Sequence, residues 1–222
     1  FAIKYSYLNS YRDVPPSNSG SIVTRQPTNT GLPFLGAYYR INNNLNSVIA
    51  ELNSTFGSKY ANKFQIGYTA FRDFRETPTS SKVFPLVDIG NGAGSFSTAF
   101  GYEPFSAFNI LNSNVFQISD NFDMYKGKHT LTFGTYNEFY QFENGFDPFF
   151  YGGYQFNSLA DFYASAGYDP ATGNSITPVV GRIRQYQLGY AANADGSFPL
   201  VKVKAFQLGF YAQYKYEESD KL

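Results

Sequence analysis

Residues 114–142 have the sequence NVFQISDNFDMYKGKHTLTFGTYNEFYQF, and this stretch decides the fold of the chain. Apolar and polar side chains alternate along residues 114–125 and again along residues 129–142. A period of two is typical of β-strands with two different faces. Asp120 falls on the apolar face and departs from the pattern. The Lys126-Gly127-Lys128 segment between them is short enough for a tight turn, so we predict a β-hairpin.

The rest of the chain repeats this arrangement. Further alternating segments cover residues 1–12, 44–56, 63–73 and 206–216, and residues 57–60 form a second short turn. The long connections are rich in Pro, Gly, Ser and Asn and span about residues 13–43, 75–112 and 143–202. When the strands are taken as alternately up and down, every long loop falls at one end and every short turn at the other. Soluble β-sandwiches have no reason to segregate loop lengths, whereas outer-membrane β-barrels have short periplasmic turns and long outer loops.

Composition excludes several other classes of protein. The chain has 17 basic and 17 acidic residues, so its net charge gives no basis for binding nucleic acid. It has no Cys, which excludes disulfides and thiolate metal sites. No apolar run approaches the roughly 18 residues of a membrane-spanning helix. Tyr and Phe are abundant, at 20 and 24 residues, and suit the lipid-facing wall and interface girdles of a barrel.

We therefore predict an all-β fold, an antiparallel transmembrane β-barrel segment with short periplasmic turns and long extracellular loops, in the bacterial cell outer membrane. Six strands cannot close a barrel, since bacterial barrels use about eight or more. We expect residues 1–222 to be the interior portion of one outer-membrane β-barrel domain. The remaining strands would come from the rest of the same polypeptide.

Several segments resemble a known family. Residues 116–122 (FQISDNF), 125–134 (YKGKHTLTFG), 154–162 (YQFNSLADF) and 208–214 (LGFYAQY) are similar to the barrel of TonB-dependent outer-membrane transporters, in particular the Oar-like branch of Bacteroidetes-type Gram-negative bacteria. Tyr214 stands where that family usually has Asp, so the last motif matches in part. The resemblance implies a 22-stranded barrel, a plug domain that would precede Phe1 and is absent here, and coupling to the TonB system through the missing plug.

One aromatic cluster is the candidate for contacts with a ligand or a partner protein. It consists of Phe146, Phe149, Phe150, Tyr151 and Tyr154 in the third long loop. Aromatic faces stack on sugars, rings or peptide side chains. The alternative to a ligand site, which we favour, is that the cluster packs the loop onto its neighbours or meets a partner protein. In the same loop, residues 158–163 could form a helical turn and residues 182–190 a short strand.

No pattern indicates catalysis. His129 is the only histidine, and neither a Ser-His-Asp triad nor a zinc motif has other support. Gly90, Gly92 and Gly94 are spaced like a phosphate loop but lack the following Lys and helix. We expect no enzyme activity, no cofactor and no metal site.

Two functions follow from this interpretation. The first is part of a TonB-dependent transporter that imports an unidentified substrate, with outer-membrane lipid and the TonB system as partners. The alternative is a non-transporting barrel that serves as an adhesin or as a structural subunit of an envelope complex, with surface lipoproteins or other envelope subunits as partners. A soluble β-sandwich enzyme is a distant third.

Overall fold

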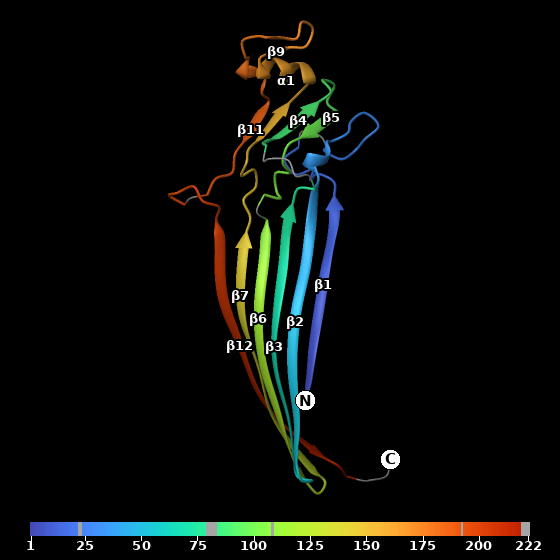
Figure 1. Ribbon diagram of the computed structural model, residues 1–222, viewed down its shortest axis with the longest axis vertical. Helices are drawn as coiled ribbons and strands as arrows, with labels where there is room; N and C mark the ends of the chain where they lie inside the picture. Colours follow the sequence, from blue (N-terminus) through green and yellow to red (C-terminus); the bar gives the residue numbers. More distant parts are fainter. Residues whose placement is uncertain (22–23, 79–83, 108, 192, 219–222) are drawn as a thin grey trace.

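The computed structural model describes residues 1–21, 24–78, 84–107, 109–191 and 193–218. Its main body is a tall, curved sheet of long strands, and a smaller folded unit lies at one end of this sheet (Figure 1). Among the described residues, no helix is both long and apolar enough to cross a membrane.

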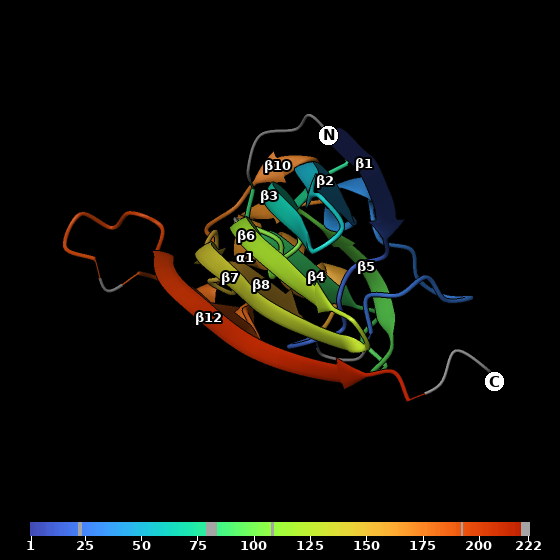
Figure 2. The same ribbon diagram turned by 90° about the horizontal axis from the view of Figure 1, so that it is seen from below.

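The tall sheet contains six strands in the order β1-β2-β3-β6-β7-β12, and all neighbours are antiparallel. The strands are β1 (Ala2–Val14), β2 (Tyr39–Phe56), β3 (Tyr60–Glu76), β6 (Ile110–Lys126), β7 (His129–Gly145) and β12 (Leu200–Tyr216). All six predicted strands are present, and five of the six are markedly longer than the alternation indicates. The pairing register of this sheet has no interruption. The backbone hydrogen bonds between strands continue beyond the residues where the apolar alternation ends, and the strands are longer than predicted for that reason. Seen from below, the sheet is curved but remains open (Figure 2).

Both predicted short turns are present. Gly57 begins the turn between β2 and β3, Gly127 begins the turn between β6 and β7, and each has a φ of 58°. Glycine adopts this left-handed conformation without the steric penalty of a Cβ. The two turns lie side by side, because the Tyr125 amide donates to the Lys59 carbonyl at 2.8 Å.

The long connections are more ordered and shorter than the sequence indicates. Their described residues together form a second folded unit, which we call the cap: residues 15–21, 24–38, 77–78, 84–107, 109, 146–191 and 193–199. Residues 22–23, 79–83, 108 and 192 of the predicted loops lie outside the described residues. The cap contains a four-stranded sheet in the order β11-β8-β4-β5. Its strands are β4 (Leu86–Gly90), β5 (Phe96–Phe100), β8 (Gly153–Phe156) and β11 (Gln185–Gln187).

The remaining elements of the cap are short. They are the 3-10 helices η1 (Leu35–Ala37) and η2 (Val180–Arg182), the helix α1 (Leu159–Ala166), and the paired strands β9 (Tyr168–Asp169) and β10 (Asn174–Ser175). The predicted helical turn is the start of α1, which Ser158 caps by accepting the Asp161 amide. The predicted strand at 182–190 is reduced to β11.

The cap contains the only packed core in the described part of the chain. Leu86, Phe96, Ala99 and Ala37 form one buried cluster, and Val87, Ile89 and Phe156 form another. These residues come from all three connections. No apolar side chain described in the tall sheet is buried to this extent. The sheet therefore has two open faces, whereas the cap is stabilised like a small soluble domain.

Candidate functional site

The tall sheet has one apolar face, whose side chains line up in rows across the strands. The register places one aromatic or aliphatic side chain of every strand in a single row. This row consists of Tyr5, Val48, Tyr68, Phe116, Phe139 and Phe206. The bottom row of the same face contains Phe56, Tyr60, Met124, Leu131 and Tyr214. We call the face between these rows the apolar band.

The height of the apolar band matches a membrane. Val48 and Phe56 mark its two edges on β2, and at a rise of about 3.3 Å per residue they lie about 26 Å apart along the strand. Strands of outer-membrane barrels are tilted and cross the bilayer with about 9–11 residues, so the nine residues from Val48 to Phe56 have the length of one crossing. The exceptional Asp120 lies within the band, where the Asn62 side-chain amide donates to it at 2.7 Å.

The opposite face of the same strands is polar. Glu51 on β2 accepts hydrogen bonds from Asn53 at 2.6 Å and Gln65 at 2.7 Å, and Lys63 lies 3.1 Å away as an ion pair. Thr132 on β7 donates to Asp123 on β6 at 2.5 Å. Charged and amide side chains on this face require water or polar partners, so this face suits the interior of a large barrel.

Above the apolar band, the same face changes to polar side chains at the cap end of the strands. One row contains Arg72, Asn112, Glu143 and Lys202, each directly opposite the next. Asn112 donates to Glu143 at 3.1 Å, and the Lys202 ammonium lies 3.4 Å from the same carboxylate. Arg72 donates to Asn114 at 2.9 Å.

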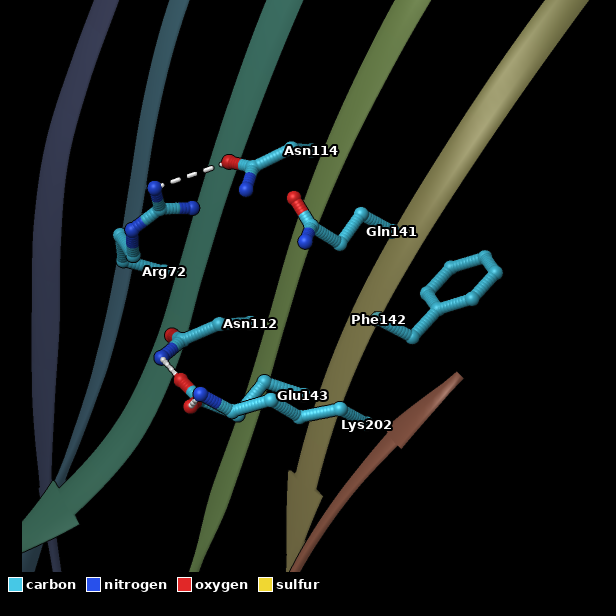
Figure 3. Close-up of a pocket in the computed structure, with 7 residues that line it drawn as sticks. All are labelled: Arg72, Asn112, Asn114, Gln141, Phe142, Glu143 and Lys202. Atoms are coloured by element: carbon cyan, nitrogen blue, oxygen red, sulfur yellow. Dashed lines mark hydrogen bonds and ion pairs between the residues drawn. The ribbon is translucent and has the colours of Figure 1, made fainter. Parts of the chain in front are cut away.

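These side chains surround a hollow of about 180 Å³, which Asn114 and Gln141 also line. Figure 3 shows six of its side chains gathered on one side of the strands, whereas Phe142 points to the other side. We call Arg72, Asn112, Asn114, Gln141, Glu143 and Lys202 the rim site.

A second hollow of about 430 Å³ connects the rim site to the cap. Arg72 and Asn112 line both hollows, and Tyr102 and Tyr151 of the cap complete the second. The two tyrosine rings contact edge to face, with centroids 5.4 Å apart. Burial raises the pKa of both phenols, so both stay neutral at physiological pH. The combined surface offers aromatic faces, amides and charged groups within one depression.

A buried ion pair attaches the first connection to the cap sheet. Arg25 is 0% exposed, and its guanidinium lies 3.2 Å from the carboxylate of Asp88 on β4. The same guanidinium donates to the carbonyls of Ser17 and Ser19 at 2.6 and 2.9 Å. Glu103 is also buried, and this burial raises its pKa, although hydrogen bonds from Ser106 and the Phe105 amide act in the opposite direction. These contacts join the first connection to the second within the cap.

The structure disperses the aromatic cluster named from the sequence. Phe149 is buried against Phe105, with centroids 5.4 Å apart. Tyr154 packs on Tyr186 at 4.7 Å, whereas Phe146 is exposed.

Phe150 contacts Phe198 and Tyr151, with ring centroids 5.5 and 5.2 Å away. Tyr151 is the one member of the predicted cluster among the residues that line the rim hollows. The binding of a ligand or partner by these aromatics remains a prediction.

Sequence reasoning missed the rim site. Asn112, Glu143 and Lys202 fall at the edges of segments interpreted as loops, and Arg72 was not singled out. The period of two could have indicated the rim site. On the face that carries the apolar band, every second residue beyond the band is polar: Asn114 and Asn112 on one strand, Gln141 and Glu143 on the next. His129 lies at the opposite end of the sheet, where its ring nitrogen is 2.7 Å from the Tyr214 hydroxyl.

Comparison with known proteins supplies the family. Neither the curated proteins nor the solved structures contain a match to this chain. A family model described as "Outer membrane beta barrel domain" matches residues 1–222. Since that match covers the whole chain and agrees with the two-faced sheet, the protein belongs to the outer membrane beta barrel domain family and is located in the bacterial outer membrane.

Proposed function

We propose that this chain forms part of the wall of a TonB-dependent outer-membrane transporter with a 22-stranded barrel, and that the complete protein imports an unidentified substrate. One observation carries the proposal: a polar face lies directly behind an apolar band of membrane height. In a closed barrel this polar face would line a wet interior through which a substrate can pass. The resemblance of residues 116–122, 125–134 and 154–162 to TonB-dependent transporters supports the finer assignment.

In this proposal the cap makes the first contact with the substrate. It is an ordered unit at the end of the strands where the long loops gather, so it would meet substrates before they reach the interior. Its aromatic side chains, among them Tyr151, would supply contacts for a ligand. We assign no covalent chemistry and no cofactor to this chain, and the proposed partners are outer-membrane lipid and the TonB system.

The first experiment is mass spectrometry of the intact polypeptide extracted from outer membranes in detergent. The proposal expects a plug domain and a TonB-binding segment before Phe1, and loss of uptake when the TonB system is deleted. A polypeptide without a plug would overturn the transporter assignment.

A non-transporting barrel that acts as an adhesin or as a structural subunit of an envelope complex is the second candidate. The cap favours it, because a unit with its own sheet and core can present a stable binding surface to surface lipoproteins or other envelope proteins. Partner proteins that remain bound in cells without TonB, together with unchanged growth on all tested nutrients, would support this candidate over the first.

A further inference from the structure

We propose that the rim site binds the phosphorylated sugar head group of a glycolipid in the outer leaflet of the outer membrane. The inference depends on the location of the protein and on the two faces of the sheet, not on transport. Its failure would therefore leave the proposed function standing.

The position of the rim site is the first argument. Phe139 in the upper row of the apolar band and Glu143 in the rim site are on the same face of β7, four residues apart. This separation corresponds to about 13 Å along the strand. A lipid whose chains cover Tyr68, Phe116 and Phe139 would therefore have its head group beside the rim site.

The rim site and the row next to it carry more positive than negative side chains. Arg72 and Lys202 belong to the rim site, and Lys204 lies opposite Gln141 on the same face. Glu143 is the one carboxylate in these two rows of the described sheet. The side chain of Lys202 is 69% exposed and that of Glu143 only 31%, so the ammonium group is more accessible than the carboxylate. Arg and Lys are the side chains that hold phosphate oxygens.

The amides are the third argument. The Asn112 amide nitrogen donates one hydrogen bond to Glu143, and the carbonyl oxygen of the same amide has no hydrogen-bond donor. Asn44, which lines the second hollow, also has an amide oxygen without a donor. Rotation of the Asn44 amide would present an acceptor to a hydroxyl group, and the faces of Tyr102 and Tyr151 close the same hollow. A site that binds hydroxyl groups beside a phosphate would recognise a phosphorylated sugar.

The test uses the full-length protein in detergent micelles and native mass spectrometry. The probes are a lipid A-type glycolipid with its phosphates and the same molecule after dephosphorylation. The proposal expects the phosphorylated form to bind, and the double variant Lys202→Gln/Lys204→Gln to bind it about tenfold more weakly. The matched control is Lys59→Gln/Lys126→Gln, which removes two lysines from the opposite end of the sheet.

A second variant, Arg72→Gln, guards against an effect of Lys202 or Lys204 on folding, and Arg72→Lys should retain part of the binding because it keeps the charge. The two Arg72 variants are first checked for normal folding, which is seen as heat-modifiable migration on gels. Equal binding of the phosphorylated and dephosphorylated glycolipids would overturn the proposal. So would unchanged binding by the double and Arg72→Gln variants, an equal loss in the control, or equal binding of phosphatidylglycerol or inorganic phosphate alone.

Discussion

At the scale of single residues, the most consequential contact is the buried ion pair between Arg25 and Asp88. Breaking a buried pair costs about 3–5 kcal/mol, because the remaining charge stays buried without its counter-ion. We expect Arg25→Leu to loosen the cap by this order, seen as faster hydrogen exchange of β4 and β5 in the detergent-solubilised protein. Arg182→Leu, whose exposed pair with Asp161 is also 3.2 Å long, should change exchange very little. Equal effects of the two substitutions would contradict this account.

The buried carboxyl group of Glu103 makes the stability of the cap depend on pH. Burial holds the pKa of Glu103 above the ordinary carboxyl value, so the folded cap favours the protonated side chain. This stabilisation is complete below the unfolded pKa, about 4.3, and is lost as pH rises through the elevated folded pKa. We expect the free energy of opening of residues 103–107, from hydrogen exchange corrected for intrinsic rates, to fall as the pH rises above about 4. The Glu103→Gln variant should show a flatter profile, and identical profiles would exclude this assignment.

At the scale of the elements, the turn between β6 and β7 depends on backbone conformation alone. Gly127 has a positive φ, yet no heavy atom lies within 4 Å of the place a Cβ would take. Gly127→Ala should therefore destabilise the protein by about 1 kcal/mol through backbone strain. The urea midpoint of the protein reconstituted in vesicles measures this effect. Gly181→Ala is the control, since its site is equally open and its φ is not positive; a matching decrease there would disprove the strain argument.

The two faces of β12 can be tested on one strand. Phe210 lies midway along the apolar band and is 79% exposed, whereas Gln207 points to the polar face. We expect Phe210→Lys to destabilise the folded protein in vesicles by about 2–4 kcal/mol, because the ammonium enters the hydrocarbon. Gln207→Lys should have little effect on the same folding assay. The reverse order would mean that the assignment of the lipid-facing side is wrong.

At the scale of the whole molecule, the described sheet has two free edges, β1 and β12. An unpaired backbone group in the bilayer costs several kcal/mol, so an open sheet is unstable there. We expect further strands of the complete protein to pair with both edges. Slow hydrogen exchange of those β12 amides that point away from β7, measured in intact outer membranes, would support this. Rapid exchange along that edge would rule out closure at β12.

The sequence by itself determined the six strands, their hairpin turns and the side on which the long loops lie. These features depend on a period of two and on short connections such as Lys126-Gly127-Lys128, and both are local properties of the chain. Only the tertiary structure decided how the loops are organised. The cap sheet pairs β4 with β8 in parallel across more than 60 residues, and Arg25 reaches Asp88 from the first connection. The rim site likewise combines residues from β3, β6, β7 and β12. Contacts between distant segments leave no periodic signal in the sequence, because they are fixed by packing and register and not by neighbouring residues.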